Sequence, residues 1–254
     1  ILRVFGKVFV MVLVLHWVFL LLLYGVAGLV RKRNPFTFLK RMMPAYVTAL
    51  GTQSSAATIP VTLRSAKEAG VHSRIADFAI PLNANIHLAG SMITITSCSA
   101  AVSTMVQGHV PRFSSMIPLI LVLGVMMVAA PGVPGGAVMT AVGALQSMLG
   151  FSPTMIALII ALHLAQDSFG TATNVTGDGA LAAILEGMSS KQLDMPTTAE
   201  NMANAQATAD ATGLAHSDAA AAGIETAETA PQPCRVRRNK QRRNKQQEDE
   251  KPQH

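Results

Sequence analysis

Long apolar segments follow one another from residue 8 to about residue 187, separated by short polar interruptions. The first segment, residues 8–30, is 23 positions long and carries no formal charge. At 1.5 Å per residue it can cross a hydrocarbon core of roughly 30 Å as one helix. Farther on, Arg112 is the single charged residue between positions 78 and 166. No water-facing surface can be built from such a stretch, so the pattern predicts an all-α membrane protein.

Two of the later apolar segments are split by small and polar residues. Positions 52–60 separate two stretches, about 36–51 and 60–69, and each is too short to span a bilayer. Positions 132–136 divide a region of about 114–149 in the same way. Non-helical backbone at membrane depth must face protein or a water-filled cavity, so both segments predict re-entrant helical hairpins. Ordinary loops between short helices are the alternative.

A third interruption lies between the two hairpins. Residues 81–91 contain two Asn, one His, one Gly and one Pro, groups that are costly against lipid or break a helix. We therefore expect a broken membrane helix whose central carbonyls face a site. The predicted segments are a transmembrane helix (1–35), the first hairpin (36–72), the broken transmembrane helix (73–108), the second hairpin (112–150), the last transmembrane helix (153–188) and a disordered polar tail with a basic end (189–254).

The last apolar helix carries a narrow polar stripe. Asp167, Thr171, Asn174 and Asp178 are spaced by 4, 3 and 4 residues, and His163 precedes them by one turn. At 100° per residue these side chains share one helix face, with the two aspartates about 20° apart. A carboxylate at the centre of a membrane helix costs roughly 2.5–3.5 kcal/mol, so each needs a partner, a cation or water. Carboxylate, amide and hydroxyl oxygens suit a hard monovalent cation; an interhelical polar network is the alternative.

Composition and charge sharpen this picture. Half of the residues are hydrophobic and 13% are charged, against about 25% in soluble proteins, which excludes an ordinary soluble enzyme. Much of the net charge of +6 belongs to residues 234–254, where eight basic residues accompany three acidic ones. Such a tail is usually solvated, so we expect no nucleic-acid partner. Two cysteines, Cys98 and Cys234, are too few and too differently placed for a disulfide framework or a cysteine-based metal site. We expect no metal site beyond that for a monovalent cation.

The distribution of basic residues also predicts an orientation. Lysines and arginines follow the first apolar helix at positions 31–33, 40, 41, 64, 67 and 74. The positive-inside rule makes that face cytoplasmic. With three spans and two hairpins that do not cross, the C-terminal tail also lies in the cytoplasm.

Three motifs in this order resemble the dicarboxylate/amino acid:cation symporter family, also called the glutamate transporter family. The serine-rich tip of that family's first hairpin is similar to residues 53–60, Gln-Ser-Ser-Ala-Ala-Thr-Ile-Pro. Its second tip is similar to Gly-Val-Pro-Gly-Gly at 132–136, and its last-helix motif to Asn-Val-Thr-Gly-Asp at 174–178. The resemblance covers roughly residues 5–187 and implies a glutamate-transporter-like transport core. Residues 33–36 and 166–168 look closest to the sodium:serine/threonine branch.

The family resemblance implies the positions of both binding sites. The substrate would lie between the two hairpin tips and the last helix, its ammonium group on Asp167 and its carboxylate on Asn174 and the Ser54-Ser55 tip. The second hairpin would be the gate. The implied substrate site comprises Ser54, Ser55, Gly132, Pro134, Gly135, Asp167, Thr171 and Asn174. The implied cation site comprises Asn83, His87, Asn174 and Asp178, with sodium or a proton as the coupling ion and no other cofactor.

The sequence departs from the family pattern at the residues that select the substrate and one cation. The arginine that binds a side-chain carboxylate in acidic-substrate members falls at Gly170, and the arginine that some members carry in the first tip is Gln53. We therefore expect a small neutral amino acid such as serine or threonine, with an acidic amino acid or a C4-dicarboxylate as the alternative. The family's Asn-Met-Asp-Gly-Thr signature reads His-Leu-Ala-Gly-Ser at 87–91, so one cation site lacks its aspartate. His87 predicts a response to protons instead.

The family also has further N-terminal helices that form a homotrimeric scaffold. We expect this chain to be the C-terminal transport core of a longer secondary transporter in the cytoplasmic membrane. We do not expect the core alone to expose its binding site alternately to the two sides of the membrane, because that motion needs a second helix bundle. A truncated, non-functional fragment of such a carrier is one alternative. A membrane enzyme using His163 and Asp167 is another, but no nucleophile with a positioned base accompanies them.

Overall fold

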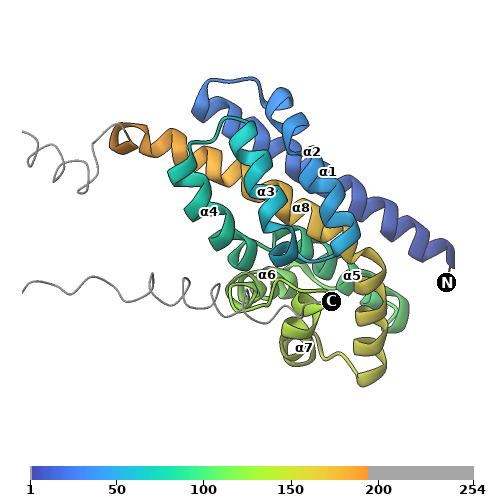
Figure 1. The fold of residues 1–254 in the computed structure, drawn as a ribbon. Coiled ribbons are helices and arrows are strands. Elements are labelled where there is room, and N and C mark those ends of the chain that lie inside the picture. Colours follow the sequence, from blue (N-terminus) through green and yellow to red (C-terminus); the bar gives the residue numbers. More distant parts are fainter. Residues whose placement is uncertain (1, 194–254) are drawn as a thin grey trace, which may run out of the picture. The chain divides into compact units, whose positions relative to one another are not determined.

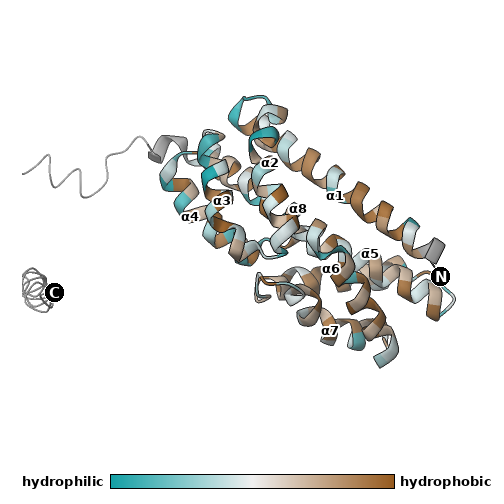
Figure 2. Ribbon diagram, turned by 45° about the vertical axis from the view of Figure 1, so that its right-hand side comes forward, coloured by the Kyte–Doolittle hydropathy of each residue, from teal (hydrophilic) through white to brown (hydrophobic). Residues whose placement is uncertain are grey.

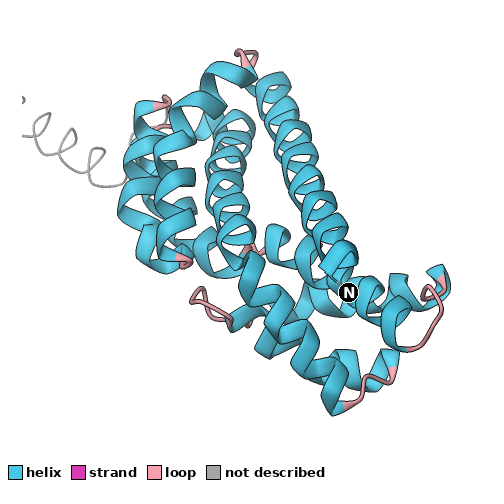
Figure 3. Ribbon diagram, turned by 90° about the vertical axis from the view of Figure 1, so that its right-hand side faces the viewer, coloured by secondary structure: helices cyan, strands magenta, loops and turns pink. Residues whose placement is uncertain are grey.

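The computed structural model describes residues 2–193, and this part of the chain consists of helices without a strand. Figure 1 shows their arrangement, and Figure 3 shows the short loops between them. The prediction of an all-α fold is confirmed. Most of the predicted tail, from residue 194 onward, lies outside the described residues. The helices are α1 (Leu2–Arg31), α2 (Pro35–Thr52), α3 (Ser55–Glu68), α4 (Ser73–Ile86), α5 (Ala89–Val106), α6 (Phe113–Met127), α7 (Gly136–Leu149) and α8 (Pro153–Leu193).

Within residues 2–193, three helical segments are long and apolar enough to cross a membrane, as the sequence predicts. They are Phe5–Arg31 in α1, Ser73–Val106 across α4 and α5, and Pro153–Ser189 in α8. The helices of the second hairpin, α6 and α7, are apolar but shorter. The last helix continues to Leu193, beyond the predicted end at residue 188.

The outer face of α1 is apolar. Every fourth residue from Val8 to Tyr24 is buried, while Val10, Val14 and Leu22 on the opposite face are 55–67% exposed. Figure 2 shows α1 as one of the most hydrophobic helices. A continuous exposed apolar face of this kind is typical of a helix in contact with lipid.

The first hairpin is tighter than the sequence predicts. We expected positions 52–60 to interrupt the helices, yet only Gln53 and Ser54 separate α2 from α3. The Ser54 hydroxyl accepts a hydrogen bond from the Ala57 amide at 3.2 Å, which caps α3 and lets the helix begin at Ser55. Pro60 therefore lies inside α3 and does not begin it.

The broken helix is interrupted by two residues, His87 and Leu88, within the predicted segment 81–91. Beyond the break, α5 begins against α8. A Cβ atom on Gly90 would lie 2.4 Å from the Gly170 carbonyl oxygen, so only glycine permits this approach. The close contact fixes the break beside the middle of α8.

The second hairpin has a longer tip, residues 128–135, between α6 and α7. Gly135 has a φ of 73°, in the left-handed region, directly before the first residue of α7. A glycine adopts this conformation at little cost, which lets the tip turn sharply into the helix. The glycine-rich interruption predicted at 132–136 thus lies in the tip and the first residue of α7.

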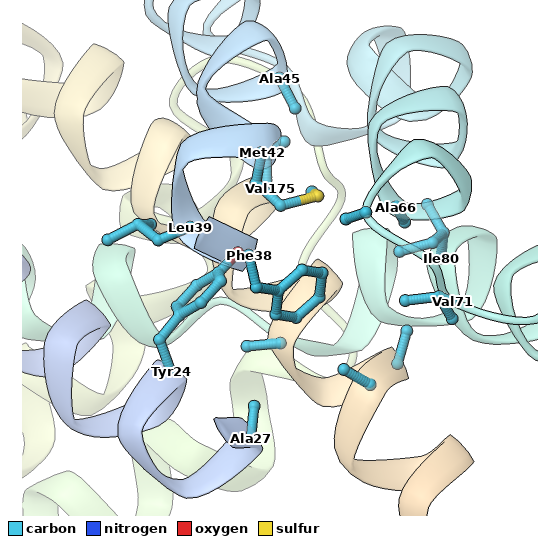
Figure 4. Packing of buried hydrophobic residues seen from close by; sticks show 14 of the residues in the cluster. Tyr24, Ala27, Phe38, Leu39, Met42, Ala45, Ala66, Val71, Ile80 and Val175 are labelled. Carbon is cyan, nitrogen blue, oxygen red and sulfur yellow. The ribbon is translucent and has the colours of Figure 1, made fainter. Parts of the chain in front are cut away.

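Helix α8 takes part in both hydrophobic clusters of the protein. Its C-terminal half packs with α1 to α4, where Tyr24 and Phe38 lie 5.2 Å apart between ring centroids beside Met42 and Val175, as Figure 4 shows. Its N-terminal half packs with α5, α6 and α7 through Ile159. The polar stripe of α8 lies between residues of these two clusters and faces the helix breaks.

Candidate functional site

The polar stripe on α8 is almost completely buried. Asp167 and Thr171 are each 4% exposed, and Asn174 and Asp178 are each 1% exposed. Buried polar groups need hydrogen-bonding partners. Asn174 and Asp167 accept from backbone amides at two of the predicted interruptions, whereas Asp178 binds the side chain of His87.

Asn174 caps the start of α5. Its Oδ1 accepts a hydrogen bond from the Gly90 amide at 2.7 Å, and its Nδ2 donates to the Ser91 hydroxyl at 3.0 Å. Leu88, the residue before α5, makes no side-chain capping bond of its own. The first turn of a helix has unsatisfied amide groups, so α8 supplies a cap that α5 lacks.

Asp167 does the same for α7. Its Oδ2 accepts a hydrogen bond from the Gly135 amide at 2.8 Å, and Gly135 directly precedes α7. A carboxylate at a helix N-terminus is stabilised by the helix dipole. On its other oxygen, Oδ1, the Thr171 hydroxyl and the His163 Nε2 atom each lie at 3.5 Å, so that oxygen has no close partner within this group.

The tips of the two hairpins meet directly in front of the stripe. The Gly132 carbonyl accepts two hydrogen bonds from the first hairpin, one from the Ser54 hydroxyl at 2.8 Å and one from the Ala56 amide at 3.2 Å. Both donors belong to the N-terminal end of α3, where the helix dipole favours a negative group. The first hairpin thus offers two hydrogen-bond donors, and a carbonyl of the second hairpin accepts from both.

A small cavity lies between the tips and α8. Its volume is about 10 Å³, which is room for one water molecule. No lysine or arginine is among its lining residues. They are Gln53, Ser55, Leu88, Ser91, Pro131, Gly132, Val133, Ala137, Asp167, Thr171 and Asn174.

The structure brings most of the predicted substrate-site residues to this cavity. Five of them line it, whereas Ser54 and Gly135 form the hydrogen bonds that hold the second tip in place. Pro134 is not among the lining residues. It is the next-to-last residue of the second tip and directly precedes Gly135.

Several lining residues were absent from the predicted site. Ser91 and Leu88 belong to the break at 81–91, whose carbonyls we expected to face a site, but no periodicity singled out these two side chains. Gln53 donates a hydrogen bond from Nε2 to the Ser168 hydroxyl at 2.8 Å, which links the first tip to α8. Ser168 directly follows Asp167 in the sequence, and this adjacency is the one signal that could have suggested a contact between Ser168 and the first tip.

The predicted cation site is arranged around Asp178. The His87 Nδ1 atom donates to Asp178 Oδ1 at 2.8 Å, and Oδ2 has no hydrogen-bond partner in the described part of the chain. The Asn83 carbonyl accepts from the His87 amide at 2.8 Å. The side-chain oxygen of Asn174 is already occupied by Gly90. His87 and Asp178 are therefore brought together, while Asn83 and Asn174 have other partners.

His16, the strongly polar residue of α1, also contacts the break. Its Nε2 atom donates to the Gly90 carbonyl at 2.9 Å and lies 3.2 Å from the Thr94 hydroxyl. Tyr24, farther along α1, donates to the Thr176 carbonyl at 2.8 Å. The first helix thus supports the broken helix and α8 from behind the site.

Interrupted membrane helices that meet around buried polar side chains are typical of secondary transporters. The comparisons agree with this class. The model of the sodium:dicarboxylate symporter family matches residues 1–188, and the chain belongs to that family.

The relatives include excitatory amino acid transporters. Excitatory amino acid transporter 4 of Mus musculus is 34% identical over 168 residues, 66% of this chain and 30% of the relative. Excitatory amino acid transporter 1 of Homo sapiens is 33% identical over 166 residues, 65% of this chain and 30% of the relative. Excitatory amino acid transporter 2 of Homo sapiens is 32% identical over 184 residues, 72% of this chain and 31% of the relative. The chain thus spans about 30% of the length of these relatives, and the likeness to the serine/threonine branch stays a prediction.

Proposed function

We propose that the protein to which this chain belongs is a sodium-coupled symporter of a small neutral amino acid such as serine or threonine. One observation carries the proposal. The second tip places a carbonyl, that of Gly132, on the donors of the first hairpin, and an amide, that of Gly135, on the carboxylate of Asp167. An acceptor and a donor held in this way have the pattern of an amino-acid zwitterion.

The proposed binding step is an exchange of partners. The substrate carboxylate replaces the Gly132 carbonyl on the Ser54 hydroxyl and the Ala56 amide, and the substrate ammonium replaces the Gly135 amide on Asp167. Because the cavity of about 10 Å³ is too small for an amino acid, the second tip must move away for the substrate to enter. The second hairpin is then the gate, and it closes again over the bound substrate.

The preference for a neutral side chain rests on the charges of the cavity. Asp167 is its one charged lining residue, so a second substrate carboxylate would be left without a partner. Gly170, where acidic-substrate members carry arginine, packs against α5, since a Cβ atom there would be 3.5 Å from the Ser91 amide nitrogen. Gln53 already binds Ser168.

The second candidate is an acidic amino acid or a C4-dicarboxylate. It is favoured by the names of the family and of its excitatory amino acid transporters. A retained Asp167, which suits an ammonium group, favours an amino acid over a plain dicarboxylate.

Sodium is proposed as the coupling ion, as the family name implies. The unpartnered Oδ2 of Asp178 and the carbonyls of the α4–α5 break are the oxygens that would bind it. His87 occupies the other carboxylate oxygen, so a proton is the alternative coupling ion. The remaining proposals follow from the family: a homotrimer for the full-length protein, the cytoplasmic membrane as its location, and a cytoplasmic tail.

Uptake by the full-length protein in liposomes tests this function. We expect saturable uptake of serine, threonine or alanine that requires an inward sodium gradient. Competition by aspartate, glutamate and succinate distinguishes the second candidate. Uptake of acidic substrates alone would overturn the proposed neutral substrate, and uptake driven by a proton gradient without sodium would overturn the proposed ion. The same assay on the 254-residue chain alone should show no transport, because alternating access needs a second bundle.

A further inference from the structure

A cavity of about 270 Å³ lies at the end of the first membrane span, away from the site described above. Its wall contains three arginines, Arg31, Arg33 and Arg41, and no acidic side chain. The rest of the wall is small or apolar, including Ala27 and Phe38. This combination of guanidinium groups and apolar surface has no role in the proposed transport site.

Two of the three arginines are held in place by the protein. Arg31 forms an ion pair with Glu186 at 2.9 Å and donates to the Gly70 carbonyl at 2.5 Å. Arg41 donates from one guanidinium nitrogen to the Glu68 carbonyl at 2.9 Å. Each bond uses one of the five N–H groups of a guanidinium, so both side chains keep donors for another acceptor.

Arg33 differs from the other two. No hydrogen bond or ion pair joins its side chain to another residue in the range 5–189. The Phe36 amide in the first turn of α2 is not free to bind an anion, because it donates to Asn34 Oδ1 at 2.9 Å. Glu186, the acid that pairs with Arg31, also accepts a hydrogen bond from the His72 amide. The cavity therefore keeps an excess of positive charge.

The location of the cavity identifies the chemistry that would meet it. Arg31 is the last residue of the first candidate span, so the arginines lie where the apolar part of α1 ends. Leu29 and Phe36, beside them, are 80% and 68% exposed. The anionic lipids of a membrane surface carry phosphate groups, and guanidinium forks match phosphate oxygens in two-point contacts.

We propose that Arg31, Arg33 and Arg41 form a binding site for a phosphate group, supplied by the headgroup of an anionic phospholipid or by a free phosphate ion. The three guanidinium groups bind the phosphate oxygens, and Leu29 and Phe36 contact the acyl chains when the source is a lipid. The site depends on the first helix and the first hairpin, and it is independent of the substrate and of the coupling ion.

Lipid retention by the full 254-residue chain in detergent micelles tests the site. Native mass spectrometry counts bound phosphatidylglycerol, with zwitterionic phosphatidylcholine, whose net charge is zero, as the reference. We expect Arg33→Gln to weaken phosphatidylglycerol binding about tenfold, since a bond to a charged group is lost. The matched control, Arg64→Gln, removes the same charge from an arginine whose side chain is 81% exposed and lies outside the cavity; it should change binding less than twofold.

The source of the phosphate is separated by a second arm with inorganic phosphate. Competition between phosphate and phosphatidylglycerol that depends on Arg33 supports a site for free phosphate as well as lipid. Lipid binding that phosphate does not displace supports the headgroup alone. Equal losses in Arg33→Gln and Arg64→Gln would overturn the proposal, as would binding of neither ligand. Arg33→Lys guards against a folding defect, because it keeps the charge and should recover part of the affinity; no recovery would also count against the site.

Discussion

The Asp167 carboxylate and the Gly135 amide are joined by a hydrogen bond of 2.8 Å that connects the middle of α8 to the start of α7. Asp167 is 4% exposed, so the bond is shielded from water. The same carboxylate is the proposed partner of the substrate ammonium. One residue therefore holds the second tip in place and is also the proposed ligand of the substrate.

Replacement of the charge at this position separates the two roles. In Asp167→Asn the amide oxygen still accepts from Gly135, but no anion remains for an ammonium group. We expect the free energy of unfolding to change by less than about 1 kcal/mol and substrate affinity to fall roughly 10- to 100-fold. Uptake by the full-length protein and its unfolding in detergent measure the two effects. Asp77→Asn, a 52% exposed aspartate paired with Lys67, is the control; wild-type uptake in Asp167→Asn would contradict the assignment.

The cap that Asn174 provides for α5 predicts a loss of stability. The Gly90 amide donates a hydrogen bond to Asn174 Oδ1 at 2.7 Å, and in Asn174→Ala this buried amide is left without a partner. We expect a destabilisation of about 1–3 kcal/mol, measured by denaturant unfolding of the chain in detergent. Asn85→Ala, on an exposed asparagine that donates to the Pro81 carbonyl, should cost less. Equal losses in both variants would argue against the cap.

The close approach of α5 and α8 predicts that alanine is tolerated at some glycine positions and destabilising at Gly90. A methyl group in Gly90→Ala would meet the Gly170 carbonyl oxygen at 2.4 Å, so the helices must separate. We expect a loss of about 1–3 kcal/mol from overpacking. Gly143→Ala in α7 has nothing within 4 Å of the added atom and should be neutral or stabilising by up to about 1 kcal/mol. Thermal unfolding of the two variants in parallel measures the difference. The prediction is wrong if Gly90→Ala is as stable as the wild type.

Charge in the first tip should change substrate selection. Gln53 lines the cavity and donates to Ser168 at 2.8 Å, so Gln53→Arg places a guanidinium near the position of a substrate side chain. We expect the ratio of aspartate to serine affinity to rise about tenfold or more. Competition for uptake in the full-length protein measures this ratio. Gln53→Glu is the matched variant of opposite charge and should lower it; a rise in both variants would exclude an electrostatic cause.

The contact between His87 and Asp178 predicts a change in sodium dependence. The imidazole donates to Asp178 Oδ1 at 2.8 Å and must yield if sodium is to use both carboxylate oxygens. We expect His87→Asn, which supplies an amide oxygen in its place, to lower the sodium concentration needed for half-maximal uptake. Uptake measured over a range of sodium concentrations gives this value. Asn85→Ala, also near the end of α4, serves as the control, and an unchanged value in His87→Asn would remove sodium from Asp178 Oδ1.

The sequence predicts the helical fold, the three spans and the polar stripe because each has a local cause. An apolar run of sufficient length gives a span, and spacings of 3 and 4 residues place Asp167 and Asp178 on one face. The extents of the interruptions were less well predicted. Ser54 caps α3, so the polar run at 52–60 is mostly helix, and Pro60 is accommodated inside it.

Contacts between distant segments could not be predicted in the same way. The bonds from Asn174 to Gly90 and from Ser54 to Gly132 join residues 84 and 78 positions apart. Hydrophobic periodicity reports which face of a helix is buried, not which backbone group it meets. The family resemblance placed both tips near the last helix, but it did not indicate that the second tip fills the positions proposed for the substrate.

That arrangement makes the second tip a tethered competitor of the substrate. Its Gly132 carbonyl and Gly135 amide are always present at a high effective concentration, so the proposed amino-acid substrate would have to displace them before it binds. The affinity expected for that substrate is then a difference between two similar sets of hydrogen bonds and is weaker than its own contacts alone would provide. In the proposed carrier the second tip would also cover Asp167 when no substrate is bound, which would limit the leak of ions through the empty state.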